Sequence, residues 1–79
     1  MIFLIEYNRQ KGSMVTFEKF KNTERKKAQR KRLELELDLN RRNIVHEVVL
    51  LEARTEEALR RTHQRYFESL YTIAQSTGQ

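Results

Sequence analysis

The stretch that decides the fold is Ile44–Val45–His46–Glu47–Val48–Val49–Leu50–Leu51–Glu52–Ala53, which runs into Arg54–Thr55–Glu56–Glu57. Its first part is apolar and β-branched over the length of one strand, which is typical of a strand buried on both faces. Thr55 followed by two glutamates is a helix-start signal, because the threonine can cap free backbone N–H groups and acidic residues suit the positive end of the helix dipole. We therefore predict a strand over 45–52 and a helix that begins after Thr55.

Two strands are expected before this stretch. Residues 2–7 are β-branched and aromatic, and residues 14–17 alternate apolar and polar side chains. The turn cluster between them contains Gly12, which can take the positive φ that a short hairpin loop needs. The sequence thus predicts a β-hairpin over 2–17, in which the strand with a polar side, 14–17, lies at an edge.

The segment from Glu24 to Asn43 consists of good or fair helix formers, and either Asn22 or Thr23 can cap it. Its leucines alternate with acidic residues over 33–39, so an amphipathic strand is the alternative there. The absence of β-branched and aromatic residues favours a helix. On that helix Leu33 and Leu37 lie almost opposite Leu35 and Leu39, which gives it two apolar sides.

The resulting order, ββαβα, predicts an α+β fold: a two-layer domain with a three-stranded antiparallel sheet of order 2-1-3 packed with two helices. We expect one domain over 1–75 and a frayed tail over 76–79. The apolar stripe of the second helix consists of Leu59, Thr62/His63, Tyr66/Phe67, Leu70/Tyr71 and Ile73/Ala74.

Two layers cover only one face of the sheet. One set of side chains is expected to face the helices: Phe3, Ile5, Tyr7, Val15 and Phe17. The other set, Ile2, Leu4, Met14 and one side of 48–51, then needs a cover. Either the second helix crosses to that face, or another copy of the chain covers it.

The chain has 79 residues and no cysteine, so neither a disulfide framework nor a thiolate metal site supports its core. A chain this small often gains burial by self-association, and we expect a homodimer. No targeting signal or membrane span is apparent, because Glu6 interrupts the apolar N-terminus. A cytoplasmic protein is expected.

The positive charge is concentrated in one segment, 19–32, which contains eight basic residues and a single acidic residue, Glu24. Clustered Lys and Arg neutralise phosphates, so this segment is a candidate contact for nucleic acid or another polyanion. A solvated helix face that keeps the protein soluble is the simpler alternative. The candidate contact residues are Lys19, Lys21, Arg25, Lys26, Lys27, Arg30 and Lys31.

Catalytic and metal-binding patterns are weak. His46 beside Glu47, or His63 alone, has no third ligand at a suitable spacing, and neither Ser13 nor Ser69 has the surroundings of a nucleophile. We expect no enzyme, no metal and no cofactor. The aromatic residues of the second helix, Tyr66, Phe67 and Tyr71, could stack on bases, but a role in the core is favoured.

Two functions therefore compete: a small nucleic-acid-binding protein with a basic first helix, and a homodimeric protein–protein interaction module without a nucleic-acid role. The module would associate through the uncovered sheet face, the edge of strand 45–52 or the outer side of the first helix. Its candidate contact residues are Ile2, Leu4, Val48, Leu50, Leu33 and Leu37.

Overall fold

A computed structural model describes residues 1–68 of the chain. Its elements are β1 (Ile2–Asn8), β2 (Ser13–Phe20), the 3₁₀ turn η1 (Asn22–Glu24), α1 (Arg25–Arg41), β3 (Glu47–Glu52), α2 (Glu56–Thr62) and the 3₁₀ turn η2 (Gln64–Tyr66). The strands form one sheet in the order β2-β1-β3, and β1 is antiparallel to both neighbours. The predicted α+β class, the hairpin and the strand order are confirmed.

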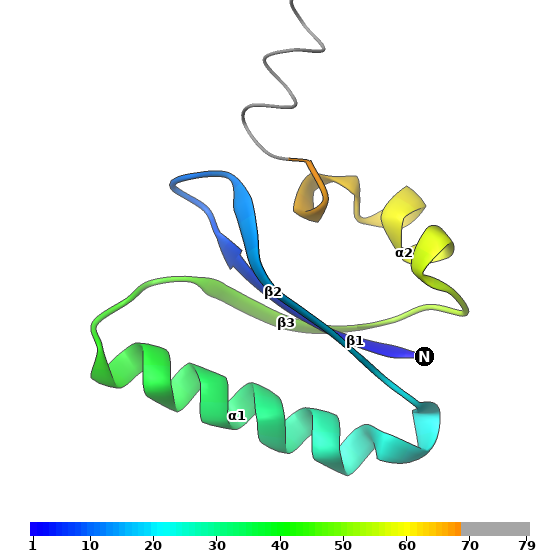
Figure 1. The fold of residues 1–79 in the computed structure, drawn as a ribbon, viewed down its shortest axis with the longest axis horizontal. Coiled ribbons are helices and arrows are strands. Elements are labelled where there is room, and N and C mark those ends of the chain that lie inside the picture. The colour runs from blue at the N-terminus through cyan, green and yellow to red at the C-terminus, as the bar shows by residue number, and fades with distance from the viewer. Residues whose placement is uncertain (69–79) are drawn as a thin grey trace, which may run out of the picture.

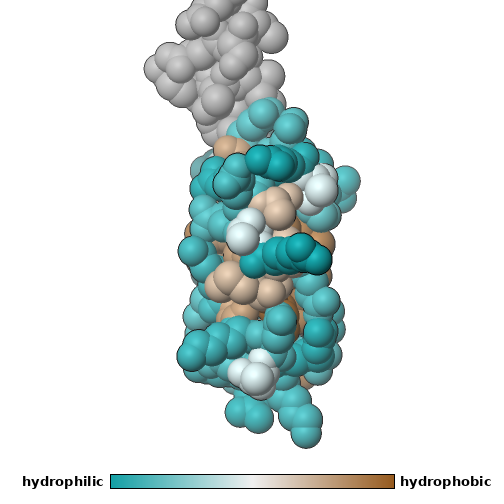
Figure 2. All heavy atoms as spheres, turned by 90° about the vertical axis from the view of Figure 1, so that its right-hand side faces the viewer, coloured by the Kyte–Doolittle hydropathy of each residue, from teal (hydrophilic) through white to brown (hydrophobic). Residues whose placement is uncertain are grey.

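The two helices lie on opposite faces of the sheet (Figure 1). Side chains alternate along β1, so Ile2 and Leu4 pack with Ala28 of α1, whereas Phe3 and Ile5 pack with Leu59 of α2. The second helix is thus the cover that one sheet face required, and the molecule has three layers rather than two. Figure 2 shows apolar residues gathered between the polar outer surfaces of these layers.

This layering corrects part of the predicted association surface. Ile2 and Leu4 are each only 1% exposed, because α1 covers them. Val48 and Leu50 are half-buried against the same cluster. These four side chains belong to the core between the sheet and α1, and they do not form an open sheet face.

A β-bulge changes the expected face of two residues in β2. The register between β1 and β2 shifts between Glu6, which pairs with Thr16, and Tyr7, which pairs with Met14. Val15 is the extra residue and is 53% exposed, while Met14 packs on the core beneath α2. The expectation that Val15 is a core residue and that Met14 lies on the other face was wrong, because one extra residue inverts the alternation.

Helix α1 includes residues 33–39, so the alternating leucines are helical as predicted. The predicted caps are not used. The chain enters through η1, where the backbone N–H of Lys21 donates to Glu24 Oε1 (2.8 Å), and Glu24 itself is the N-cap of α1. This hydrogen bond is the main reason why the pKa of Glu24 is lowered from its ordinary value.

Asn43 lies two residues after the end of α1 and turns the chain toward β3. Its φ of 55° is in the left-handed region, where asparagine is tolerated better than other residues with a Cβ. The N–H of Asn43 donates to the carbonyl of Asn40 (3.2 Å), and the N–H of Ile44 donates to that of Leu39 (2.9 Å). This pair of bonds is a Schellman motif, and it brings Ile44 next to Leu39.

Helix α2 begins as predicted: Thr55 is the N-cap, and its hydroxyl accepts from the N–H of Ala58 (3.1 Å). The predicted continuous stripe is interrupted, because α2 ends at Thr62 and the chain continues as η2. Leu59 and Tyr66 are nevertheless buried. Strand β3 begins at Glu47 rather than 45, and β2 extends to Phe20. The predicted stripe residues from Leu70 to Ala74 and the tail 76–79 lie outside the described residues.

Candidate nucleic-acid interface

The outer side of α1 carries a ridge of four exposed residues at helical spacing: Lys26, Arg30, Leu33 and Leu37. On the opposite side Ala28 and Leu39 are buried against the sheet. We call the four exposed residues the outer ridge. Its first half is basic and its second half is apolar, so one helix side offers two different surfaces.

Basic residues beside the outer ridge form ion pairs with carboxylates at its borders. On one flank Lys27 lies 3.7 Å from Glu24 and Lys31 lies 3.9 Å from Glu18 of β2. On the other flank Arg25 pairs with Glu52 of β3. The basic side chains of these pairs are at least half exposed, and exposed pairs contribute at most about 1 kcal/mol. A phosphate group can therefore displace these carboxylates from the basic side chains at little cost in free energy.

Two of the predicted contact residues lie apart from this helix side. Lys19 is in β2, pairs across the sheet with Phe3 and contacts Glu56 of α2 (3.0 Å), so it belongs to the opposite layer. Lys21 is exposed just before η1. The structure brings together the remaining five predicted residues along α1, from Arg25 to Lys31.

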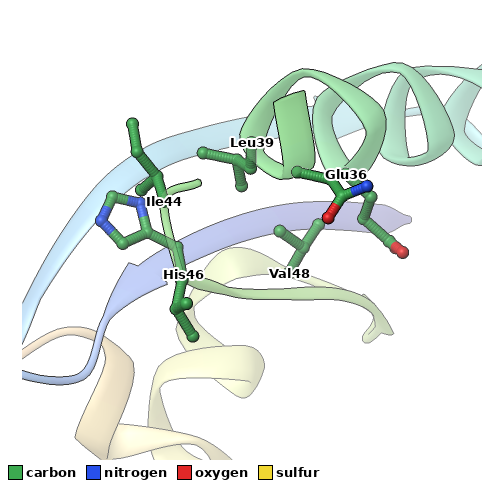
Figure 3. A pocket seen from close by; sticks show the side chains of 7 residues that line it. Glu36, Leu39, Ile44, His46 and Val48 are labelled. Atoms are coloured by element: carbon green, nitrogen blue, oxygen red, sulfur yellow. The ribbon is translucent and has the colours of Figure 1, made fainter. Parts of the chain in front are cut away.

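A shallow hollow of about 310 Å³ lies between α1 and the segment that leads into β3 (Figure 3). Helix α1 supplies Glu36, Leu39 and Asn40, and the chain after it supplies Ile44, Val45, His46 and Val48. Apolar side chains from both sides thus form much of its lining. Sequence reasoning gave no sign of this hollow, because the Schellman motif that shapes it depends on one left-handed residue.

A buried carboxylate holds the segment before β3 against the sheet. Glu6 is 4% exposed; its Oε2 forms a hydrogen bond with His46 Nδ1 (2.6 Å), and its Oε1 accepts from the Thr16 hydroxyl (2.7 Å). Both oxygens therefore have a partner, as a buried carboxylate requires. His46 and Glu47, which are adjacent in sequence, have different partners, since adjacent residues of an extended chain point to opposite faces. The sequence offered one signal for the bond between Glu6 and His46: Glu6 is the lone charged residue inside the apolar central strand β1.

Glu47 points to the α2 side and accepts from Arg65 (2.7 Å) and from the Tyr66 hydroxyl. These two donors lower the pKa of Glu47, against the opposing effect of burial. Burial, together with the bond to Glu47, raises the pKa of Tyr66. Tyr66 also packs edge-to-face on Tyr7 and is 5% exposed, so it is part of the core as predicted.

The remaining candidate residues from the sequence are His63, Phe67, Ser69 and Tyr71. Within residues 1–68 no group of three His, Cys, Asp or Glu side chains could hold a metal ion. His63 Nδ1 lies 2.8 Å from the Thr62 hydroxyl at the end of α2. Phe67 is half-buried against the core, with Arg60 over its ring, while Ser69 and Tyr71 lie outside the described part of the chain. In that same part no helix is long and apolar enough to cross a membrane.

Comparison with protein-family models, curated proteins and solved structures finds no match to this chain. The site therefore has to be interpreted from its own geometry. That geometry offers a basic helix side, an apolar continuation of it and an open hollow beside β3.

Proposed function

We propose that the protein is a non-enzymatic binding protein that contacts nucleic acid through the basic half of α1. The position of Lys26 and Arg30 supports this most directly. Both point away from the sheet, both are exposed, and neither has an acidic partner within residues 1–68. Such charges can neutralise phosphates and release counterions without first breaking an ion pair.

The flanking bases extend this contact. Lys27 and Lys31 lie on one side of Lys26 and Arg30, and Arg25 lies on the other, so a phosphate backbone can cross the helix in contact with several of them. Contacts of this kind position a nucleic acid and do not read its bases. The proposed interaction is therefore independent of the base sequence of the nucleic acid. The proposal also includes a cytoplasmic location, as expected from the amino-acid sequence.

One observation favours a second function, the protein–protein interaction module. Leu33 and Leu37 are 55% and 54% exposed on the apolar half of the outer ridge. Two leucines one helical turn apart are suited to the groove of a partner. This function predicts that Leu33→Ser with Leu37→Ser removes partner binding and leaves nucleic-acid affinity unchanged.

The proposed function is tested by fluorescence anisotropy with a labelled duplex of arbitrary sequence over a range of salt concentrations. Affinity should fall steeply with salt, with a log–log slope of about 0.9 for each phosphate neutralised. Lys26→Glu with Arg30→Glu should weaken binding to all sequences and reduce the slope by about two. Stability should hardly change, because both side chains are exposed.

The matched control is Arg60→Glu with Arg61→Glu, which makes the same change of charge in α2, the opposite layer. Arg60 and Arg61 pair with Glu56 and Glu57 in their own helix. Equal binding by the two double variants would refute the role of α1, and so would a native protein that ignores nucleic acid at low salt.

A further inference from the structure

The two edges of the sheet differ in how they oppose the addition of another strand. Edge strands are usually protected by bulges and by charged side chains. The β2 edge has both, with a bulge at Val15 and the charged residues Glu18 and Lys19. In β3 four apolar residues follow one another from Val48 to Leu51, all half-buried, and no charge interrupts them. The β3 edge has no bulge, and its charged residues, Glu47 and Glu52, stand only at its two ends.

The hydrogen bonds at the start of β1 establish which backbone groups of β3 are free. Met1 and Ala53 exchange bonds in both directions, with N–O distances of 2.9 and 3.1 Å. Bonded and non-bonded pairs alternate along an antiparallel ladder, so Val49 and Leu51 also bond to β1. The backbone groups of Val48, Leu50 and Glu52 therefore point away from β1, toward the open edge.

We infer that β3 pairs with β3 of a second copy, antiparallel and about a two-fold axis at Val49. This register places the free groups of Val48 opposite those of Leu50 in the second copy, so both sets are satisfied. Because a two-fold axis perpendicular to the sheet preserves its faces, side chains that face α1 in one copy also face α1 in the other. The product is a continuous six-stranded sheet with β2 at both ends.

Side-chain chemistry selects this register over its neighbour. With the axis at Val49, His46, whose Nδ1 is bonded to Glu6, lies opposite the second copy's Glu52, which pairs with Arg25 in its own chain; a cross-strand contact between them would use His46 Nε2. With the axis at Leu50, His46 would lie opposite Arg54, and Glu52 would lie opposite an apolar residue. Charge complementarity therefore favours Val49.

The hollow beside α1 fits the same register. Leu50 of the second copy lies opposite Val48 on the α1 face, so it adjoins the hollow that Leu39, Ile44 and Val48 line, while its side chain stays packed beneath its own α1. Val45, which also lines the hollow, is 91% exposed in the single chain and would lie opposite Ala53 of the second copy.

Hydrogen exchange of the native protein tests this inference with an internal control. In the dimer, the amides of Val48 and Leu50 should exchange about tenfold or more slowly at near-millimolar than at low micromolar concentration. The corresponding outward amides of the β2 edge, Phe17 and Lys19, should exchange at the same rate at both concentrations. Exchange of Val48 and Leu50 at near-millimolar concentration that is as fast as that of Phe17 and Lys19 would overturn the inference, because the edge would then be open to water.

The absence of cysteine permits a second test. Val49→Cys should form a disulfide-linked dimer in a glutathione buffer, because Cα atoms of a non-bonded antiparallel pair are about 4.5 Å apart, within disulfide range. Val15→Cys, more exposed but on the β2 edge, should stay largely monomeric. Equal cross-linking of the two variants, or a monomeric native mass at high concentration, would refute the dimer. Neither result bears on nucleic-acid binding, which the salt series measures separately.

Discussion

At the residue scale, Glu47 connects the start of β3 to two other parts of the molecule. Its Oε2 accepts from Arg65 and Tyr66 in η2, and its Oε1 lies 3.7 Å from Arg9 in the hairpin loop. The side chain is 19% exposed, so these charge-assisted bonds are partly shielded from water. They lower the pKa of Glu47 from its ordinary value of 4.5. The stabilisation is therefore complete above pH 4.5 and is lost as pH falls through the lowered pKa of the folded state.

We expect Glu47→Gln to reduce the free energy of unfolding by about 1–3 kcal/mol at pH 7, because it removes the charge from these bonds. Thermal melts should show a decrease in Tm of about 4–8 °C for each kcal/mol. The difference from the native protein should shrink below pH 4.5, where the native carboxylate also becomes neutral. Glu57→Gln is the control, since the Glu57–Arg61 pair is 76% exposed on both sides. A pH-independent difference between Glu47→Gln and the native protein would contradict this account.

At the scale of elements, the patterns that were predictable from sequence depend on local chemistry. The hairpin, the helical composition of α1 and the Thr55 cap each involve residues close together in the chain, and each was confirmed. The bulge at Val15 and the end of α2 at Thr62 were missed, because tertiary packing decides them. Glu6 and His46, which form a hydrogen bond, are 40 residues apart in the sequence, and no sequence pattern predicts their contact. For the candidate interface, the basic segment was evident, but the separation of Lys19 from α1 required the fold.

The junction between α1 and β3 depends on Asn43, the one non-glycine residue with positive φ within residues 1–68. We expect Asn43→Gly to be neutral or slightly stabilising, because glycine takes this conformation without strain. Asn43→Val should cost about 1–2 kcal/mol, since a β-branched residue is strongly disfavoured there. Urea denaturation of both variants measures the difference. If Val is tolerated as well as Gly, the left-handed turn is not a constraint on the packing of Ile44 against Leu39.

At the scale of the whole molecule, strand β1 contributes side chains to two hydrophobic cores, one on each face of the sheet. Successive residues of β1 alternate between them: Ile2 and Leu4 pack beneath α1, and Phe3 and Ile5 pack beneath α2. All four are at most 1% exposed. Neither core can loosen without exposing the other face of the same strand, so the two helical layers are coupled through β1. Small domains of this kind unfold in one cooperative transition.

Leu59→Ala tests this coupling. Leu59 is 0% exposed in the core beneath α2, and its truncation should cost about 2–5 kcal/mol. Far-UV circular dichroism mainly follows α1, the longest helix described, whereas near-UV dichroism follows tyrosines, including Tyr7 and Tyr66 on the α2 side. If β1 couples the layers, both signals of the variant melt at the same lowered temperature. A near-UV transition that precedes the far-UV transition would show that the α2 layer separates from a sheet still covered by α1. The coupling through alternate residues of β1 would then be too weak to hold three layers together.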